Sequence, residues 1–330
     1  MTTASNLNPE SHAAFNRVAA EDRRPALSLL LTGRRGAEDS AVAPFEAFAR
    51  ENQLDLQHLW TASDGKRPVV AVLIVPGVGR TAMLFLSPLA SAAAGKIELA
   101  GRLIAHALAH LNPDKIRLAQ ALLDQGQPTQ RRAIEAGGFR FLADLAYMHR
   151  AGKAVAELPP IGLDGETLGA THWSEAARPL FTRAIADSYR GTLDCPGLLG
   201  LRDMDDIIAG HMATGRFNPK HWIVWHQGDT PAAVLLLAES AAARGFELVY
   251  LGVCPHARRR GLSRDIMQHA LHITATGGTH ASGNTPLQLA VDDRNKPALR
   301  LYRGLGFRTS VRKTALIYTP PGPPAPPADT

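Results

Sequence analysis

Hydrophobic and polar positions follow two different periods along the chain, and the two periods predict helices and strands in a recurring order. Where apolar residues recur every three or four positions, the spacing is typical of an amphipathic helix. Segments of this kind are 11–22, 42–53, 98–111, 128–138, 173–189, 201–214 and 295–306. Short apolar runs that end at glycine, proline or polar clusters predict buried strands. These runs are 68–77, 80–88, 115–123, 221–240 with a turn at QGDT, 244–255, 287–293 and 307–318.

The order of these segments repeats between the two halves of the chain. Each half has paired strands, a long helix, a strand, a short helix, a Gly-Phe pair and a final strand. Residues 118–140 also align with residues 286–308 at a few identical positions. The identical pairs are Gln120 and Gln288, Asp124 and Asp292, Arg132 and Arg300, Gly138 and Gly306, Phe139 and Phe307, and Arg140 and Arg308. A pattern repeated in this way indicates a duplicated domain.

The periodic pattern weakens near residue 151, which gives the expected domain boundaries. We expect a first domain over 1–150, a linker over 151–169 and a second domain over 170–318. The tail over 319–330 is so rich in proline that it is expected to be disordered, because proline neither donates to a sheet nor continues a helix.

Composition narrows the class of protein. The chain has 330 residues, of which 45% are hydrophobic and 20% are charged, an ordinary globular mixture. No apolar run is long enough to span a membrane, and no secretion signal is predicted at the N-terminus. Only Cys195 and Cys254 occur, so we expect a reducing, cytoplasmic environment rather than a disulfide framework. We expect no partner in the membrane.

The chain is basic, with a formal net charge of +6 and a sequence pI of about 9.6. An excess of positive charge suits either nucleic acid or a small polyanionic ligand. No segment combines dense Lys and Arg with interleaved aromatic residues. We therefore expect a small polyanion and no nucleic acid.

The stretch LGVCPHARRRGLSRD, residues 251–265, concentrates this charge between a strand and a helix. The start of a helix presents unpaired main-chain N–H groups and a partial positive charge. Glycine allows a phosphate to approach the backbone, and arginine adds charge-assisted contacts. The spacing Arg258-x-x-Gly261-x-Ser263 therefore predicts a diphosphate site, and the alternative interpretation is a solvated basic loop.

This stretch resembles the acetyl-coenzyme A signature of the GNAT acetyltransferase superfamily, Arg/Gln-x-x-Gly-x-Gly/Ala, with serine in the last position. NKPALRLYRGLGF, residues 295–307, is similar to a second block of that family, and the resemblance is sharp over 245–308. The resemblance implies an α/β (α+β) fold of two tandem GNAT-like domains. Each would be a mixed, mostly antiparallel twisted sheet flanked by helices. The plan of two domains is similar to that of mycothiol synthase.

The resemblance also implies roles for single residues. The strand with Leu251, Gly252 and Val253 would splay from its neighbour and pair with the pantetheine arm of acetyl-CoA. Asn295 would contact that arm or a water, and Tyr302 would protonate the leaving thiolate, since a phenol is protonated at neutral pH. The alternative for Tyr302 is an aromatic residue of the core. The diphosphate would lie on Arg258, Arg259, Arg260, Gly261, Leu262 and Ser263.

The general base is the least certain part of the site. Glu247 lies six residues before Val253, a position similar to that of the base in several family members, and its alternative is an outward-facing charge. Asp292 and Asp293 are weaker candidates.

Three further groups give weaker signals. Cys254 invites a covalent intermediate, but we expect direct transfer. DCPG, residues 194–197, with Tyr189 would either shape the acceptor pocket or form a plain turn. No metal is expected, because the pairs His106 and His110, and His269 and His272, lack further ligands.

The first half lacks the residues that carry this chemistry. Gly95, Lys96 and Glu98 fall opposite Arg258, Arg259 and Gly261, and a carboxylate at such a turn repels a diphosphate. Gln127 and Ile134 replace Asn295 and Tyr302. We expect a degenerate first domain without the cofactor.

The sequence thus predicts an N-acetyltransferase that moves an acetyl group from acetyl-CoA to the amine of a small molecule or peptide. The alternative is a non-enzymatic acyl-CoA-binding or scaffold protein. The acceptor, the length of the acyl group and the oligomeric state are left open.

Overall fold

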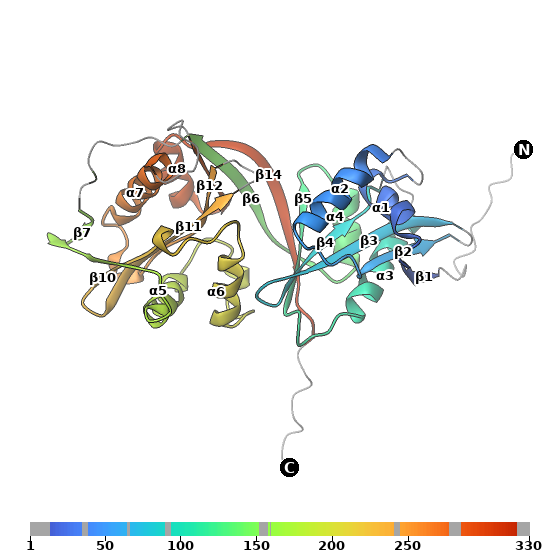
Figure 1. Cartoon of the computed structure of the whole chain (residues 1–330), viewed down its shortest axis with the longest axis horizontal. Coiled ribbons are helices and arrows are strands. Elements are labelled where there is room, and N and C mark those ends of the chain that lie inside the picture. The colour runs from blue at the N-terminus through green and yellow to red at the C-terminus, as the bar shows by residue number, and fades with distance from the viewer. Residues whose placement is uncertain are drawn as a thin grey trace, which may run out of the picture. The chain divides into compact units, whose positions relative to one another are not determined.

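Two structural units make up the chain, each built on a twisted sheet with helices on both faces (Figure 1). The computed structural model describes residues 14–34, 39–64, 67–89, 94–151, 158, 160–240, 245–276 and 285–321. Unit 1 comprises Met1–Phe141 and Ala315–Thr330, and unit 2 comprises Leu142–Thr314. The tail over 319–330, which we expected to be disordered, lies largely outside the described residues.

In unit 1 the strands β1 to β5 follow one another across the sheet in chain order, and the end of β14 lies beyond β5. Neighbouring strands are antiparallel except for β4 and β5, which are parallel. The elements are β1 (Phe15–Arg17), α1 (Arg23–Thr32), α2 (Asp39–Glu51), β2 (Leu59–Ser63), β3 (Pro68–Gly77), β4 (Thr81–Leu86), α3 (Ala94–Ala109), β5 (Leu118–Asp124) and α4 (Pro128–Ala136).

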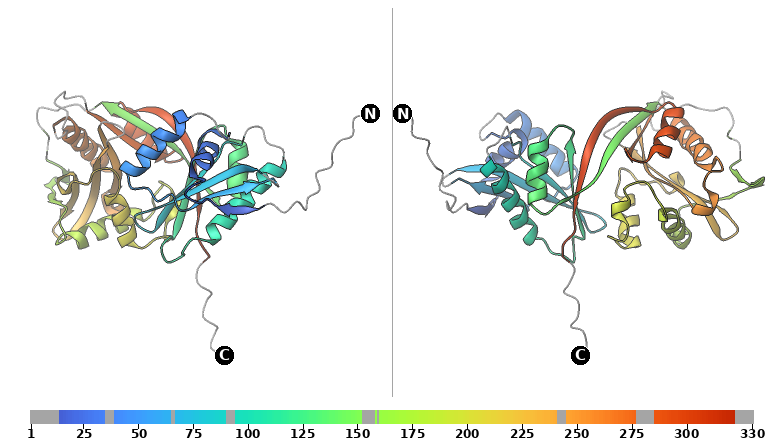
Figure 2. Two further views of the ribbon diagram at one scale, coloured as in Figure 1. Left: turned by 45° about the vertical axis from the view of Figure 1, so that its right-hand side comes forward. Right: turned by 180° about the vertical axis from the view of Figure 1, so that it is seen from behind.

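Two apolar clusters hold unit 1 together, one on each face of its sheet. Alternate residues of β3 point to opposite faces, as strand geometry requires. Leu73 packs against α1 and α2, whereas Val72 and Ile74 pack against α3 and α4. Figure 2 shows this arrangement of layers from two further directions.

Unit 2 repeats this plan. The strands lie in the order β14, β6, β13, β12, β11, β10, β9, and β12 and β13 are the parallel pair. The elements are β6 (Arg140–Ala151), β7 (Gly162–Leu163), β8 (Glu166–Thr167), β9 (Gly169–His172), α5 (Arg178–Tyr189), α6 (Met204–Met212), β10 (Trp222–Gln227), β11 (Thr230–Ser240), β12 (Gly245–Val253), α7 (Leu262–Thr276), β13 (Pro286–Asp292), α8 (Lys296–Gly304) and β14 (Arg308–Tyr318).

The sheet of unit 2 also has a cluster on each face. On one face α7 and α8 cover a core that includes Leu248, Leu289 and Tyr302. On the other face α5 and α6 cover a core that includes Phe181, Trp222 and Tyr250. Figure 1 shows the two helix pairs on opposite sides of β10, β11 and β12. The mixed α/β fold with two tandem domains is thus confirmed.

The two units exchange parts of their last strands. Leu142–Ala151 of β6 belongs to unit 2, where it pairs antiparallel with β13, and Ala315–Tyr318 of β14 belongs to unit 1. Leu316 is fully buried among residues of unit 1, whereas Thr314 bonds to Asp144 in unit 2. The two units are therefore not two contiguous halves of the chain, because unit 1 contains residues from both ends of the sequence. The core into which a strand packs decides the unit to which it belongs.

Most elements coincide with the predicted segments, and β3 does so at both ends. The helix expected over 11–22 is wrong: Phe15–Arg17 forms β1, which pairs with β2, and α1 begins only at Arg23. The pattern also missed β2 and the β7–β8 hairpin, which lies inside the expected linker 151–169. A short strand forms because it pairs with strands distant in sequence. The local pattern of hydrophobic and polar residues contains no information about those partners. Among the described residues, no helix has the length and apolar character to cross a membrane.

Candidate active site

The parallel strands β12 and β13 separate soon after they meet. They pair only at Phe246 with Leu287 and at Glu247 with Gln288. Beyond this point β12 continues to Val253 alongside β11, and β13 continues to Asp292 alongside β6. The facing edges of both strands therefore carry main-chain groups without a strand partner, and the edge of β12 includes Leu251, Gly252 and Val253, for which the family resemblance implied a splay.

A β-bulge accompanies the separation. In the β11–β12 pair, Leu236 lies opposite Tyr250 and Leu237 opposite Leu248, so Val249 is the extra residue. A bulge bends its strand and increases the local twist. The bend in β12 thus comes at Val249, two residues after Glu247, where its pairing with β13 ends.

Close packing of α5 against β12 explains the glycine at position 252. A Cβ atom at Gly252 would lie 2.3 Å from Oγ of Ser188 and 2.6 Å from its Cβ. The Ser188 hydroxyl also bonds to the Tyr250 hydroxyl at 2.8 Å. Helix α5 therefore lies directly on β12. We call the region in which β12 and β13 have separated, beyond Glu247 and Gln288, the splay.

The turn after β12 has the exposure and conformation that an anion site needs. Arg259 has φ 63° and Gly261 has φ 84°, both in the left-handed region, and α7 begins at Leu262. Arg259, Arg260 and Gly261 are exposed. In the part of the chain that the structure describes, no acceptor bonds to the main-chain N–H groups of Gly261, Leu262 or Ser263. These N–H groups and the helix terminus together can hold a phosphate.

The three arginines of the turn have different surroundings. The Arg258 guanidinium donates to the Val253 carbonyl oxygen at 3.0 Å. It also donates to the carbonyl oxygens of Ser188 at 2.8 Å and Gly191 at 3.4 Å. Its side chain therefore ties the turn to the end of α5. The sequence predicts Arg258 as part of the diphosphate site, and in the structure its guanidinium satisfies carbonyl groups at the C-terminal end of a helix.

Arg260 is also engaged: its guanidinium forms an ion pair with Asp164, between β7 and β8. Arg259 keeps its left-handed backbone and an exposed position. Within the described ranges, the Arg259 side chain has neither an ion pair nor a hydrogen bond, whereas Arg258 donates to main-chain carbonyl oxygens and Arg260 pairs with Asp164. It is therefore the arginine best placed to meet an anion.

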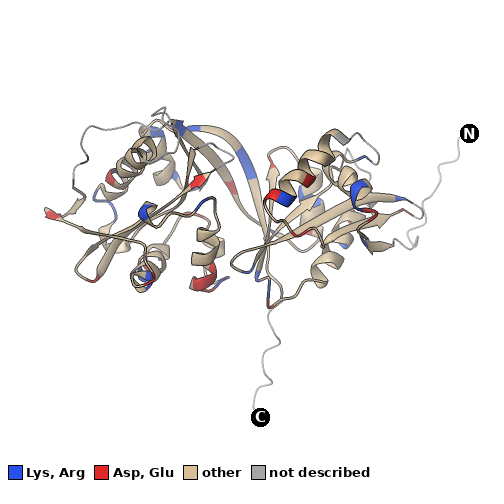
Figure 3. Ribbon diagram, viewed as in Figure 1, with Lys and Arg blue, Asp and Glu red and all other residues tan. Residues whose placement is uncertain are grey.

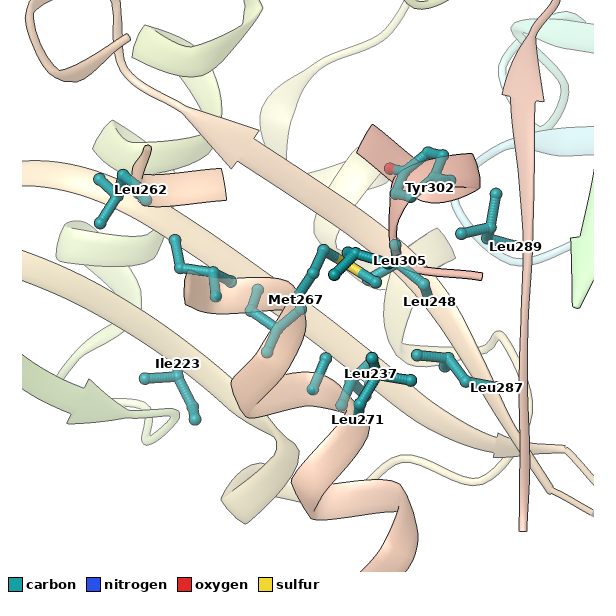
Figure 4. Packing of buried hydrophobic residues seen from close by; sticks show 14 of the residues in the cluster. Ile223, Leu237, Leu248, Leu262, Met267, Leu271, Leu287, Leu289, Tyr302 and Leu305 are labelled. Atoms are coloured by element: carbon teal, nitrogen blue, oxygen red, sulfur yellow. The ribbon is translucent and has the colours of Figure 1, made fainter. Parts of the chain in front are cut away.

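Tyr302 lies in the core cluster under α7 and α8 and is only 7% exposed (Figure 4). Burial raises the pKa of its phenol, and the negative charge of Asp194 raises it further. The phenol is therefore protonated at neutral pH and can donate a proton. Both interpretations of Tyr302 agree with this position, because the ring belongs to the core and the hydroxyl lies within the field of a carboxylate.

Glu247 occupies the closed end of the splay. Its neighbours Phe246 and Leu248 face α7 and α8, so its side chain faces the opposite side of the sheet. Burial raises the pKa of Glu247, while a hydrogen bond from Gln288 opposes the shift. The charge of Glu247 also contributes to the raised pKa of Tyr147 on β6. Glu247 is thus a partly buried carboxyl and not an outward surface charge.

The remaining candidates have partners that limit their chemistry. Asp292 is fully buried and pairs with Arg294 at 3.0 Å, and Asp293 pairs with Arg312 at 3.2 Å. Burial raises the pKa of Cys254 to about 11, so its thiol is protonated and a poor nucleophile at neutral pH.

Two further features concern Asn295 and the histidines. The Asn295 side chain caps α8 by accepting from the Ala298 N–H at 3.3 Å, and it also hydrogen-bonds to Asp194. Among the described residues, no three His, Cys, Asp or Glu side chains gather as a metal site.

Asp194 is the residue that sequence reasoning undervalued. Its carboxylate accepts from the main-chain N–H of Asp292 at 2.8 Å, a partner 98 positions away. The DCPG segment was recognised only as part of an acceptor pocket or as a turn. Its contact with β13 is a product of the tertiary fold.

Unit 1 contains the counterpart of the splay without the signature turn. Strands β4 and β5 pair in parallel at Thr81, Ala82 and Met83 and then separate. Gly95, Lys96 and Glu98 lie inside α3, and the residues just before that helix lie outside the described part. A cavity of about 240 Å³ is lined mainly by apolar residues of this unit. Its walls come from β4 (Leu84, Phe85, Leu86), β5 (Leu122, Leu123), α4 (Gln130, Ile134), the helical layer (Leu30, Leu31, Phe45) and Leu73, Pro88 and Gln127.

Comparisons with solved structures support the fold over nearly the whole chain. A GCN5-related N-acetyltransferase from Sphaerobacter thermophilus matches with a TM-score of 0.58 and 16% identity, covering 94% of this chain and 96% of that chain. A tandem GNAT protein from the clavulanic acid biosynthesis pathway matches with a TM-score of 0.50 and 13% identity, covering 94% and 100%. At these identities the likeness concerns the fold alone.

A comparison with curated proteins found no match. The acetyltransferase (GNAT) family, in contrast, matches residues 189–307, which run from the end of α5 to the start of β14. This range contains the splay, the turn at 258–263 and Tyr302. Residues 189–307 thus match the acetyltransferase (GNAT) family, and the fold of the chain resembles that of GNAT structures, one of them a tandem GNAT protein.

Proposed function

We propose that unit 2 is an N-acetyltransferase that moves an acetyl group from acetyl-CoA to the amine of a small molecule or peptide. The observation that carries the proposal is the splay between β12 and β13, which ends at an exposed turn with free N–H groups. A strand edge beside a helix N-terminus suits a ligand that has amides at one end and a diphosphate at the other.

Each part of the site has a distinct task in this proposal. The N–H groups of Gly261, Leu262 and Ser263 bind the diphosphate, and the free edge of Leu251–Val253 pairs with the pantetheine arm. The amine nitrogen attacks the thioester carbon and the carbon–sulfur bond breaks. Tyr302 gives its proton to the leaving sulfur. The raised pKa of its phenol keeps the hydroxyl protonated at neutral pH, so the proton is available for this step. A carboxylate takes the proton from the amine, and the sequence predicts Glu247 for this step.

Replacement of Tyr302 by phenylalanine tests the proposal. Phenylalanine keeps the ring in the core but removes the donor, so kcat should fall by about 100-fold or more, a typical contribution of general acid catalysis. Affinity for coenzyme A, measured by calorimetry, should stay within about threefold. Tyr318→Phe, in unit 1, is the control and should keep full turnover.

Turnover is followed by release of free thiol over a panel of amines. Binding of coenzyme A without turnover of any amine would favour the alternative, a non-enzymatic acyl-CoA-binding protein. Absence of coenzyme A binding would contradict both functions. The likeness to mycothiol synthase stays a prediction, because the comparisons address the family and the fold.

The charge distribution agrees with a small polyanionic ligand. Lys and Arg residues are interspersed with Asp and Glu residues over both units (Figure 3). Helix α6 carries Asp205 and Asp206 in its first turn, on the side of the sheet where α5 also lies. We therefore propose a small ligand and no nucleic acid as the partner of the basic turn.

A further inference from the structure

Asp194 stands at the edge of β13 that borders the splay. The main-chain N–H of Asp293 bonds to the Asp144 carbonyl oxygen on β6 at 2.8 Å. Successive N–H groups of a strand point to opposite sides. The N–H of Asp292 therefore points away from β6 and towards β12, and this is the group that donates to Asp194 at 2.8 Å.

Two contacts hold the carboxylate and leave it able to accept more. Besides the Asp292 N–H, the Asn295 side chain hydrogen-bonds to it. A carboxylate has about four acceptor positions, so roughly two stay free. The residue as a whole is exposed, whereas its carboxyl group is partly shielded from water. The next residue, Cys195, has φ 44°, a left-handed conformation that is uncommon for cysteine and that surrounding contacts must maintain.

The charge of Asp194 acts on ionisable side chains of several elements. Burial is the main cause of the raised pKa of Tyr302 on α8, of Tyr250 on β12 and of Tyr189 on α5, and the negative charge of Asp194 adds to each shift. Asp292 on β13 and the Cys195 thiol also face it. Partial loss of water around the carboxyl raises the pKa of Asp194 itself, the hydrogen bond from Asp292 opposes the shift, and the charge of Asp292 adds to it.

We propose that Asp194, and not Glu247, accepts the proton of the acceptor amine. This inference rests on the proposed acyl transfer. As the nitrogen–carbon bond forms, the proton leaves the nitrogen for the Asp194 carboxylate. The Tyr302 hydroxyl gives its proton to the thiolate as the carbon–sulfur bond breaks. Asp194 then returns a proton to the phenolate, so one proton passes from nitrogen to sulfur in each turnover.

The two carboxylates lie at opposite ends of the splay. Glu247 is level with Gln288, whereas Asp194 is bound at Asp292, four residues further along β13. At about 3.3 Å per residue the two levels are roughly 13 Å apart. Among the described residues, Asp194 is the one whose charge acts on the phenol of Tyr302. Asp292, which holds Asp194, lies just before α8, the helix that carries Tyr302.

The variant Asp194→Asn tests this role. Asparagine can still accept from the Asp292 N–H but cannot take a proton. We expect kcat/KM at pH 7 to fall 100-fold or more, the usual scale of general base catalysis. The decline of kcat/KM towards acid pH should disappear, while affinity for coenzyme A stays within about threefold. Asp205→Asn is the matched control, because Asp205 is an exposed residue of α6, and its activity and pH profile should match the parent protein.

Glu247→Gln tests the competing assignment. We call the decline of kcat/KM towards acid pH the acidic limb. If Glu247→Gln abolishes the acidic limb while Asp194→Asn keeps both the limb and the activity, the base is Glu247 and the inference is overturned. Loss of coenzyme A binding together with activity in Asp194→Asn would make Asp194 a structural anchor, which also overturns it. Should Asp194→Asn not fold, Asp194→Glu decides. Activity with a displaced acidic limb supports the role, and an unchanged limb contradicts it.

Failure of this inference is distinct from failure of the proposed function. If the unaltered protein releases no thiol with any amine, the acetyltransferase assignment fails. If the unaltered protein turns over and Asp194→Asn turns over equally well, the assignment stands and only the role of Asp194 is lost.

Discussion

Single residues in the turn after β12 determine whether its main chain can meet an anion. Arg259 and Gly261 both have positive φ, and between them they turn the chain from β12 into α7. For an L-residue with a side chain this conformation costs about 1–2 kcal/mol, whereas glycine adopts it freely. Space is not the constraint at Gly261, because a Cβ atom there would meet no atom within 4 Å. The glycine is needed for its conformation.

Replacement of Gly261 by alanine should therefore weaken binding of coenzyme A. The added strain of about 1–2 kcal/mol, relieved by rotating the N–H groups out of place, corresponds to a loss of affinity of roughly 5- to 30-fold. Calorimetric titration measures it. Gly304→Ala is the control, since a Cβ atom at Gly304 would likewise meet no atom within 4 Å, but the residue lacks a positive φ. Equal affinities in the two variants would contradict a role for the conformation of Gly261.

At the scale of elements, the contact between α5 and β12 fixes the helical layer that lies beside the splay. Gly252 allows the helix to approach, Ser188 bonds to Tyr250, and Arg258 joins the turn to the end of α5. Helix α6 completes this layer, where His211 stacks on Tyr250 with ring centroids 5.7 Å apart. Helices α5 and α6 therefore lie beside the splay and also form part of the hydrophobic core on that face of the unit 2 sheet.

The variant Gly252→Ala should lower the free energy of unfolding by about 1–3 kcal/mol, the usual cost of overpacking. Its Cβ would lie 2.3 Å from Oγ of Ser188, so α5 must shift. Urea denaturation followed by circular dichroism measures the effect. The double variant Gly252→Ala with Ser188→Gly should recover part of the loss. Gly95→Ala, in α3 with open space around it, should not destabilise.

His211 should make the stability of unit 2 depend on pH. Burial, with a smaller contribution from the charge of Arg202, lowers the pKa of His211 to about 4 from 6.5. The unfolded chain therefore binds the proton first, and stability falls as pH drops from about 6.5 to 4. The loss is up to about 3 kcal/mol for this group.

Denaturation at pH 7 and at pH 4.5 measures this dependence. His211→Phe keeps an aromatic ring against Tyr250 but removes the titrating group, so the difference between the two pH values should shrink. His256→Gln, at an exposed position, should leave the difference unchanged. An unchanged difference in His211→Phe would show that other groups cause the acid sensitivity.

At the scale of the whole molecule, the last strand belongs to two cores. Residues up to Thr314 belong to unit 2, and Ala315–Tyr318 belong to unit 1. Leu316 and Ile317 are fully buried. The C-terminal end of the chain is therefore needed for the core that the N-terminal residues begin.

Leu316→Ala should consequently destabilise unit 1, by about 2–5 kcal/mol as for other buried leucines. Hydrogen exchange resolved by peptide should show faster exchange in β3, β4 and β5, and little change in β10, β11 and β12. Val311→Ala, at a 39% exposed position of the same strand, is the control and should change neither unit appreciably. Faster exchange confined to unit 2 would contradict the placement of Leu316.

The sequence by itself determined the order of elements, the duplication and the signature turn, because these depend on local periodicity and on short motifs. Gly261, Asn295 and Tyr302 are recognisable in one stretch of chain. Only the tertiary structure decided the exchange of strand ends, the use of Arg258 as a tie to α5 and the contact of Asp194 with Asp292. Each of these contacts joins residues far apart in sequence. The local sequence pattern does not indicate which distant group bonds to a given carbonyl or N–H group, or which core a strand completes.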